Sequence, residues 1–177
     1  SAERAAELTR QLLVFARRQV AHPVVIDVGA ALANQDTFLR RVLSPCHVLA
    51  YDIQPGARVR IDPNQFDQVV MNLVLNARDA LVVGGQITIS TKVRQMEVGD
   101  PIFAGLPAGS YVAIAVADAG SGMPPEVLAQ ACEPFFTTKE TGKGTGLGLS
   151  VVHGIVCAAN GRLHLISTPD RGTVATV

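Results

Sequence analysis

Helical spacing collects amide and carboxylate side chains on one face of the segment 62–81. At 3.6 residues per turn these polar positions fall within a narrow arc, apart from the apolar stripe, and they are Gln65, Gln68, Asn72, Asn76 and Asp79. Asparagine is a poor helix former, so an exposed helix face seldom favours it. Its amide oxygen, however, is a suitable ligand for a hard cation such as Mg²⁺. The face therefore suits metal binding, although a plain solvated face fits the same pattern.

A carboxylate followed by two glycines ends the strand expected over 111–117. Asp118 can accept a hydrogen bond from an exocyclic amine, and Gly120 and Gly122 allow the backbone to turn tightly against a flat ring. Taken alone, this motif also fits a simple turn that ends a strand.

Four glycines alternate with other residues over 142–148, the segment called the glycine loop below. Their amides can surround phosphate oxygens, and the start of the helix that follows adds a favourable dipole. The spacing is neither that of a Walker A loop nor that of a Rossmann turn. A flexible linker is the alternative, but linkers rarely alternate so regularly before an apolar helix.

Two of the six phenylalanines, Phe135 and Phe136, lie in the segment 133–139, called the phenylalanine segment below. Together with the glycine loop it forms a long connection of the kind that often acts as a lid. We expect this lid, about 132–148, to be mobile when no ligand is bound. A hydrophobic anchor for the loop is the other interpretation, and the two are compatible.

In this order, the four segments resemble the motifs of sensor histidine kinases. Residues 72–80 are similar to their N box, 118–122 to the G1 box, 133–139 to the F box and 142–148 to the G2 box. The resemblance covers roughly residues 62–177. The amino-acid sequences of the motifs are most like those of soluble or hybrid kinases. It implies the Bergerat fold of the gyrase, heat-shock chaperone, histidine kinase and MutL ATPases. That fold is an α+β two-layer sandwich in which helices cover a mixed sheet.

The resemblance also implies ATP and Mg²⁺ as cofactors, with a role for each matching position. Asn76 would ligate the Mg²⁺ that bridges the phosphates. Asp118 would bind the adenine amine, and Gly120 and Gly122 would shape the pocket around it.

On the phosphate side, the resemblance implies that Asp79 lies near the phosphates or the ribose. Lys139 or Lys143 would meet the phosphates, and Phe135 and Phe136 would pin the lid. The remaining positions expected to line the nucleotide are Thr138, Gly144, Thr145, Gly146, Leu147 and Gly148.

Position 72 distinguishes the branches of this superfamily. The gyrase and MutL branches carry there a glutamate that activates water, whereas this chain has Asn72. An amide is a poor base, so we expect slow hydrolysis and favour transfer of the γ-phosphate to a histidine, with Asn72 and Lys139 at the catalytic centre. Such transfer needs mainly positioning and charge neutralisation. An ATPase of the same superfamily, or a nucleotide-sensing regulatory module, is the alternative.

The four histidines do not match the family's acidic acceptor motif, and we interpret His22, His47, His153 and His164 as structural or surface residues. This chain alone is therefore not expected to phosphorylate itself. The partners that the resemblance implies are the protein's own dimerisation domain with its acceptor histidine, a response-regulator receiver domain, and a second copy in a full-length homodimer.

Residues 1–19 read as one helix with an apolar stripe at Leu8, Leu12 and Phe15. They resemble the end of the second dimerisation helix of histidine kinases, whereas an ordinary helix docked on the core is the alternative. We therefore divide the chain into a partial dimerisation helix, 1–20, and a catalytic ATP-binding domain, 21–177.

The elements that must position the four motifs follow from periodicity, caps and turns. A hairpin is expected from strands 47–53 and 58–61 around the turn Gln54–Gly56. The other elements expected are helices over 29–43, 62–81 and 150–160, a short helix after Pro124, and strands over 22–28, 86–97, 110–118, 162–167 and 172–177. Their order favours α+β with one mixed or antiparallel sheet.

Composition limits the remaining possibilities. The chain has 15 basic and 15 acidic residues, and this balance argues against nucleic acid or an anionic membrane as a partner. No apolar run approaches the length of a bilayer span. Cys46, Cys132 and Cys157 are interpreted as buried thiols in a reducing compartment. We therefore expect a cytoplasmic location, which leaves room for a membrane anchor elsewhere in the parent protein.

Overall fold

The computed structural model describes residues 21–81, 83–97, 105–139 and 144–177. The expected helix and domain over 1–20 lie outside these residues. The described elements follow one another as β1 (Val24–Asp27), α2 (Val28–Val42), β2 (His47–Ile53), β3 (Arg58–Ile61), α3 (Pro63–Ala80), β4 (Gly85–Met96), β5 (Gly109–Asp118), α4 (Pro125–Gln130), α5 (Gly148–Ala158), β6 (His164–Thr168) and β7 (Gly172–Thr176).

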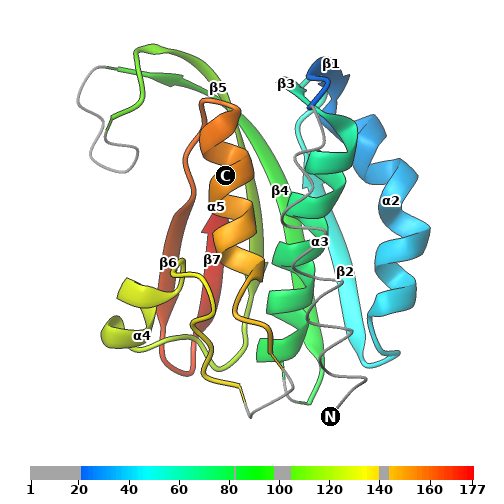
Figure 1. The fold of residues 1–177 in the computed structure, drawn as a ribbon. Coiled ribbons are helices and arrows are strands. Elements are labelled where there is room, and N and C mark those ends of the chain that lie inside the picture. The colour runs from blue at the N-terminus through cyan, green and yellow to red at the C-terminus, as the bar shows by residue number, and fades with distance from the viewer. Residues whose placement is uncertain (1–20, 82, 98–104, 140–143) are drawn as a thin grey trace, which may run out of the picture.

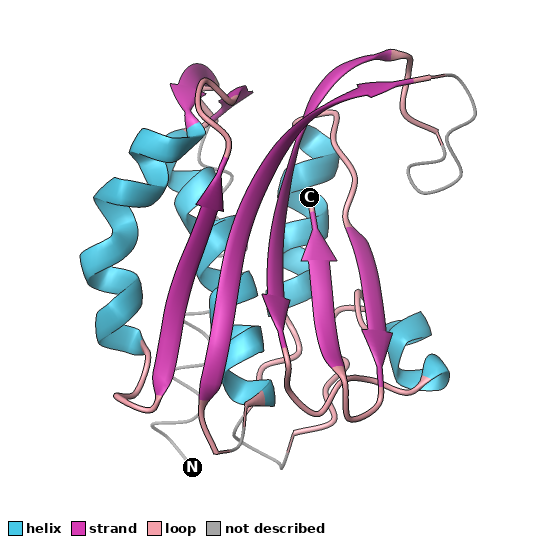
Figure 2. Cartoon of the chain, turned by 180° about the vertical axis from the view of Figure 1, so that it is seen from behind, coloured by secondary structure: helices cyan, strands magenta, loops and turns pink. Residues whose placement is uncertain are grey.

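Five strands form one sheet in the order β2-β4-β5-β7-β6. β2 pairs with β4 in parallel, and the other three pairs are antiparallel. The helices α2, α3 and α5 cover one face of this sheet (Figure 1), and the opposite face carries no helix of the described residues (Figure 2). The prediction of a two-layer α+β sandwich with a mixed sheet is confirmed.

The helix α3 occupies the centre of the helical layer. Asp62 caps its start by accepting a hydrogen bond from the Asn64 amide, and Pro63 follows in the first turn, where a missing N–H costs nothing. Its apolar stripe is buried against the sheet, and the buried members are Phe66, Val69, Val70, Leu73, Val74 and Ala77. Burial of each large side chain stabilises the fold by about 1.5–3 kcal/mol. The polar face of α3 is thereby turned away from the sheet's centre.

The predicted hairpin between 47–53 and 58–61 is wrong, although both strands exist. β3 pairs antiparallel with β1 in a separate two-stranded ribbon, and β2 pairs with β4. The turn between them docks elsewhere: the Gln54 amide donates to Thr91 Oγ1 at 2.8 Å, and the Val93 amide donates to Gln54 Oε1 at 2.7 Å. These bonds hold the turn on β4, so β3 continues away from β2 and leads into α3.

The cysteines are not the buried thiols that composition suggested. Cys46 is exposed, and Cys132 and Cys157 are partly exposed. Cys46 lies in the turn after α2, and Cys157 lies near the end of α5. A short apolar side chain near a helix end does not have to face the core. Composition alone therefore does not predict whether a given cysteine is buried.

Candidate functional site

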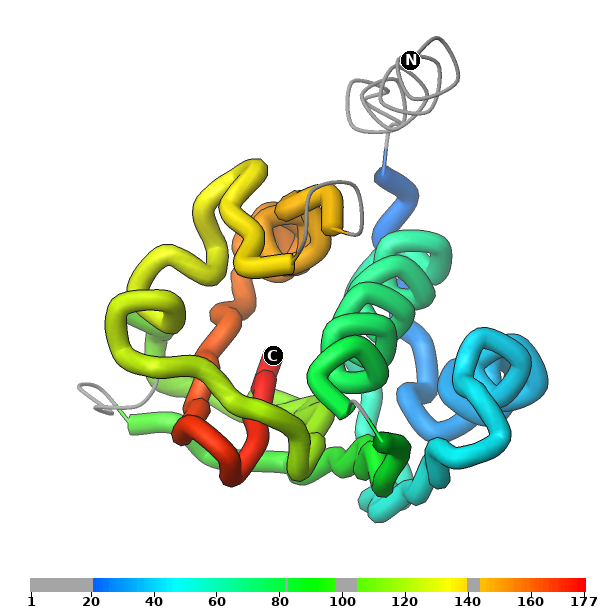
Figure 3. Tube along the Cα trace, turned by 90° about the horizontal axis from the view of Figure 1, so that it is seen from below, coloured from blue at the N-terminus to red at the C-terminus, as the bar shows by residue number. Residues whose placement is uncertain are grey.

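A cavity of about 380 Å³ lies between α3 on one side and the phenylalanine segment with α5 on the other. Figure 3 shows this arrangement from below, with α3 in green, the segment before the glycine loop in yellow and α5 in orange. The ends of β5 and β7 contribute the third wall. All four motifs of the sequence therefore contribute to one pocket, whose volume is typical of small-molecule sites.

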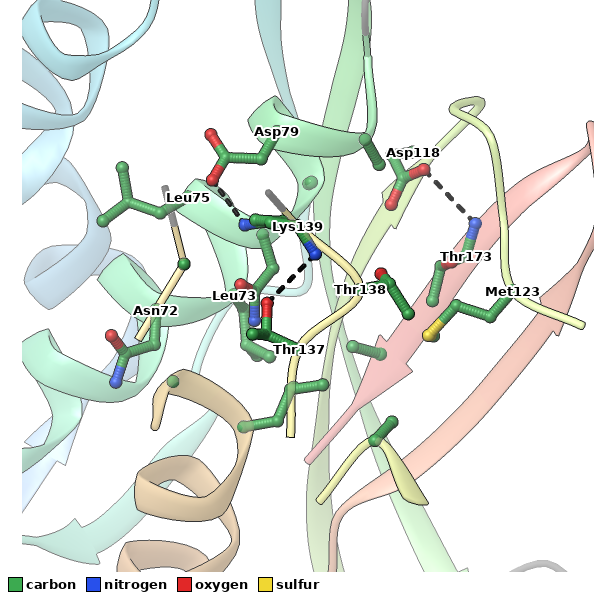
Figure 4. Close-up of a pocket in the computed structure, with 18 of the residues that line it drawn as sticks. Asn72, Leu73, Leu75, Asp79, Asp118, Met123, Thr137, Thr138, Lys139 and Thr173 are labelled. Atoms are coloured by element: carbon green, nitrogen blue, oxygen red, sulfur yellow. Dashed lines mark hydrogen bonds and ion pairs between the residues drawn. The ribbon is translucent and has the colours of Figure 1, made fainter. Parts of the chain in front are cut away.

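The polar face of α3 supplies Asn72, Asn76 and Asp79 to this pocket. Asn76 lies directly beside the start of α5. A Cβ added at Gly148 would lie 3.5 Å from Asn76 Nδ2 and 3.6 Å from Oδ1, so glycine leaves the amide accessible from the loop. Figure 4 shows Asn72 and Asp118 far apart, on opposite sides of the view.

Asp118 stands at the end of β5 and is only partly exposed. Its Oδ1 accepts hydrogen bonds from the Gly120 amide at 2.9 Å and the Thr173 amide at 3.3 Å. Burial raises the pKa of this carboxyl, and the two backbone bonds oppose that shift. Both bonds that the described residues make go to Oδ1, so Oδ2 is the oxygen that can accept from a ligand amine.

The two glycines after Asp118 have different roles. Gly122 lines the pocket with φ of +62°, and a Cβ there would lie 2.0 Å from the Thr168 carbonyl oxygen. Gly120 is not among the described lining residues. It packs against the end of α3, where a Cβ would lie 2.5 Å from the Ala80 carbonyl oxygen, because the Ser121 amide donates to that same oxygen. Gly120 supports the pocket from behind.

The phenylalanine segment and the glycine loop are joined by backbone contacts. The Phe135 amide donates to the Gly146 carbonyl at 2.9 Å, and a Cβ on Gly146 would lie 2.3 Å from the Phe135 carbonyl carbon. Phe136 lines the pocket, whereas the side chain of Phe135 is 61% exposed. The expectation that both rings pin the lid is therefore wrong for Phe135, whose backbone makes the connection instead.

The described part of the glycine loop faces the pocket at the expected positions, and these lining residues are Gly144, Thr145, Gly146 and Gly148. Thr138 also lines it, but Leu147 does not, and Lys143 lies outside the described residues. The start of α5 at Gly148 has no side-chain cap. Its first amides therefore remain available to an anion at the helix N-terminus.

Three charged residues are linked beside the pocket. Lys139 Nζ lies 2.5 Å from Asp79 Oδ2, while Arg78 donates to Asp79 Oδ1 through Nε at 2.8 Å and Nη2 at 2.6 Å. Arg78 also reaches the Val42 carbonyl through Nη1 at 3.0 Å. Burial raises the pKa of Asp79, but the bonds from Lys139 and Arg78 outweigh it and leave the pKa below its ordinary value.

These side chains fit a magnesium nucleotide. Asn76 offers the hard oxygen that Mg²⁺ prefers, Asp118 offers an acceptor for an amine, and Lys139 with the start of α5 offers donors for phosphate. In the described ranges no three histidine, cysteine or acidic residues are grouped as a metal site. A magnesium ion would therefore take most of its ligands from phosphate and water, as Mg²⁺ commonly does.

The closing strands supply residues that the sequence reasoning missed. Thr173 on β7 bonds Asp118, and Met123 and Leu165 line the pocket beside it. The Met123 amide donates to Ser167 Oγ on β6, so these strands also hold the turn after Asp118. No sequence signal identified them, because their place beside Asp118 depends on the pairing of β7 with β5, a strand far away along the chain. None of the four histidines is among the lining residues that the structure describes.

Comparison with known proteins gives similar sequences and folds. A profile described as "Histidine kinase-, DNA gyrase B-, and HSP90-like ATPase" matches residues 61–177. The chain is 43% identical over 178 residues to Sensor kinase CckA of Brucella abortus (strain 2308), covering 98% of this chain and 18% of that protein. It is 37% identical over 160 residues to Two-component sensor PprA of Pseudomonas aeruginosa, covering 88% and 16%. The chain thus spans less than a fifth of these relatives.

Solved structures share the fold at lower identity. The mycobacterial sensor histidine kinase MprB superposes with a TM-score of 0.68 at 21% identity, covering 88% of this chain and 95% of that chain. The catalytic domain of histidine kinase ThkA gives a TM-score of 0.64 at 24% identity, covering 88% and 93%.

Proposed function

The chain belongs to the histidine kinase-, DNA gyrase B- and HSP90-like ATPase family, and we propose that it binds ATP with Mg²⁺ as the catalytic domain of a two-component sensor kinase. The γ-phosphate would pass to a histidine on the protein's own dimerisation domain. The observation that supports this most strongly is that all four motifs line one pocket, with Asp118 at one side and Asn72 at the other (Figure 4).

Asp118 recognises the adenine ring in this proposal. Its Oδ1 is held by the Gly120 and Thr173 amides, so the carboxylate cannot rotate freely and Oδ2 faces a defined direction. An exocyclic amine that donates to Oδ2 distinguishes adenine from a base carrying a carbonyl there. Gly122 and Met123 line the pocket beside the ring.

Asn76 and the start of α5 hold the phosphate end. When bound, Mg²⁺ would neutralise charge on the phosphates and favour their transfer. Asn76 supplies one oxygen to that ion, Lys139 donates to the phosphates, and the uncapped amides at Gly148 add hydrogen bonds. These groups position the phosphates and balance their charge, which phosphoryl transfer chiefly requires.

Asn72 makes phosphate transfer a better proposal than hydrolysis. It lies one helical turn before Asn76 on the same face of α3, and both line the pocket. A neutral amide does not take a proton from water at pH 7, so this position holds no base for hydrolysis. The role that we propose for Asn72 is to orient reacting groups by hydrogen bonding.

The proposed partners follow from the family. They are the dimerisation domain that carries the acceptor histidine, a receiver domain of a response regulator, and a second copy in the full-length homodimer. A cytoplasmic location is part of the same proposal. No helix within the described ranges has the length and apolar character needed to cross a membrane.

Calorimetric titration of the 177-residue chain with ATP, with and without Mg²⁺, tests the binding proposal. We expect saturable one-site binding that weakens when Mg²⁺ is removed. Absence of binding under both conditions would contradict the proposal at its base.

Transfer is tested separately by adding a dimerisation domain that carries the acceptor histidine. Radiolabelled γ-phosphate should appear on that domain and not on this chain. Rapid release of free phosphate without transfer would favour the ATPase alternative, and tight binding without transfer would favour a nucleotide-sensing module.

A further inference from the structure

Asp79 has both carboxylate oxygens engaged by cations of this chain. Oδ2 receives Lys139 at 2.5 Å, and Oδ1 receives two bonds from Arg78. Both oxygens of the carboxylate are therefore paired with cations, and these pairs offset its charge. In this arrangement Asp79 binds Lys139, a residue that is itself expected to meet the phosphates.

Arg78 fixes Asp79 in place from the opposite side. Its Nη1 donates to the carbonyl of Val42, the last residue of α2, where the helix end carries partial negative charge. The side chain of Arg78 is 34% exposed and that of Asp79 is 26% exposed. Two packed helices thus define the position of the carboxylate, and Lys139 is the partner that can leave.

Lys139 comes from a different part of the chain, 60 residues away, at the end of the described phenylalanine segment. Its side chain is 36% exposed, so the pair with Asp79 is held only weakly against water. A triphosphate offers the same ammonium more charge and several acceptor oxygens. The ammonium can therefore exchange from carboxylate to phosphate without a large barrier.

We propose that Asp79 is a positioning residue that acts through Lys139. It holds the ammonium beside the pocket, and a nucleotide takes the ammonium over only if its phosphates reach Lys139. Asp79 thereby competes with phosphate for the ammonium of Lys139. The site is then selective for nucleotides whose phosphate chain is long enough to reach Lys139. This inference rests on the proposed function for its ligand, but the ion pair itself is tested without one.

The first experiment uses no nucleotide. The wild-type chain and Asp79→Asn are treated with a water-soluble acylating ester, and modification of each lysine is followed by mass spectrometry. Loss of the carboxylate should free the ε-amino group of Lys139 and speed its acylation several-fold. Lys92, which is exposed on β4, is the internal control and should react equally in both proteins. Equal acylation of Lys139 in both proteins would overturn the proposal.

The second experiment compares ligands of different phosphate length. Asp79→Asn should bind Mg·ATP about two- to fivefold more tightly, the change expected for loss of one competing, partly exposed ion pair. Adenosine, measured by competition, should bind both proteins equally, because it does not reach Lys139. Asp79→Glu should return ATP affinity toward the wild-type value, because it restores the carboxylate.

Three results would contradict the inference. Weaker ATP binding by Asp79→Asn would identify Asp79 as a direct ligand. A parallel change in adenosine binding would indicate a structural role. Tighter ATP binding without faster acylation would indicate simple charge repulsion in place of an ion pair. Failure of the wild-type chain to bind ATP would contradict the proposed function, whereas the acylation result would still decide whether the pair exists.

Discussion

Asp118 and Asn76 provide the specific recognition in the proposed site, and each has a chemically matched residue elsewhere. Asp118→Ala and Asn76→Ala should each weaken ATP·Mg²⁺ binding about 10- to 100-fold, because Asp118 loses a charged hydrogen bond worth about 1.5–3 kcal/mol and Asn76 loses its oxygen ligand for Mg²⁺. Asp52→Ala and Asn34→Ala replace exposed residues outside the described pocket lining and should leave affinity unchanged. Calorimetric titration compares the four variants. Near-normal affinity in both pocket variants would exclude this assignment of the site.

The two pocket carboxylates should titrate in a defined order. Burial raises the pKa of Asp118 above its ordinary 3.8, whereas Lys139 and Arg78 hold the pKa of Asp79 below 3.8 despite burial. As pH rises, Asp79 therefore loses its proton first and Asp118 later. Carboxyl ¹³C NMR of the chain during a pH titration measures both. The reverse order would mean that the ion pair or the burial of Asp118 differs in solution.

Affinity for adenosine should follow the same Asp118 proton. Only the ionised carboxylate accepts fully from the adenine amine, so binding should weaken as pH falls through the raised pKa of Asp118. Adenosine is the suitable probe because it has no phosphate that titrates nearby. Competition titrations across the acid range measure the midpoint. A midpoint below the ordinary aspartate range would contradict the assignment of Asp118 to the base.

At the scale of elements, two glycines make a matched test. Gly122 has positive φ and lies against the backbone of the β6–β7 turn, so Gly122→Ala should destabilise the chain by at least about 1 kcal/mol. Gly154 is exposed within α5 with open space around its Cβ position. Gly154→Ala should instead stabilise the chain by about 0.5–1 kcal/mol. Chemical unfolding measures both, and equal effects would refute this distinction.

Elements were predictable from sequence where local chemistry decides them. Asp62 and Pro63 mark the start of α3, and its apolar stripe marks the buried face. The boundary of α5 was less accurate: the helix begins at Gly148, inside the glycine loop, since phosphate-binding loops and helix starts share the same residues. The wrong hairpin had a different cause, because Gln54 bonds Thr91 and Val93 far along the chain and no local pattern shows this.

For the molecule as a whole, ligand binding should change amide exchange only on the side that carries the pocket. The pocket lies between α3, the phenylalanine segment and α5, whereas β1 and β3 form a separate ribbon. ATP·Mg²⁺ should therefore slow amide exchange over about 132–148 and after Asp118, and leave the β1–β3 ribbon unchanged. Hydrogen-exchange mass spectrometry gives the map. Unchanged exchange over 132–148 would count against a lid.

The order of the four motifs identified the family and predicted candidate site residues, but it did not predict the neighbours that complete the pocket. Thr173 was missed because it reaches Asp118 only through the antiparallel pairing of β7 with β5. Gly120 was expected to shape the pocket because its motif follows Asp118, but its close packing against the Ala80 carbonyl was not apparent from the sequence. A motif is recognised from adjacent residues, whereas the order of strands in a sheet depends on contacts between distant parts of the chain.

The parallel pairing of β2 with β4 has a consequence for how the chain folds. Parallel neighbours need a crossover, and here residues 54–84 form it, with α3 as its main part. The pairing of β2 with β4 therefore forms together with the docking of α3, the helix that carries Asn76. This pairing joins distant parts of the chain, so we expect it to be slow. The segment between β5 and α5 is outside this crossover. The pairing of β2 with β4 and the docking of α3 therefore do not depend on that segment.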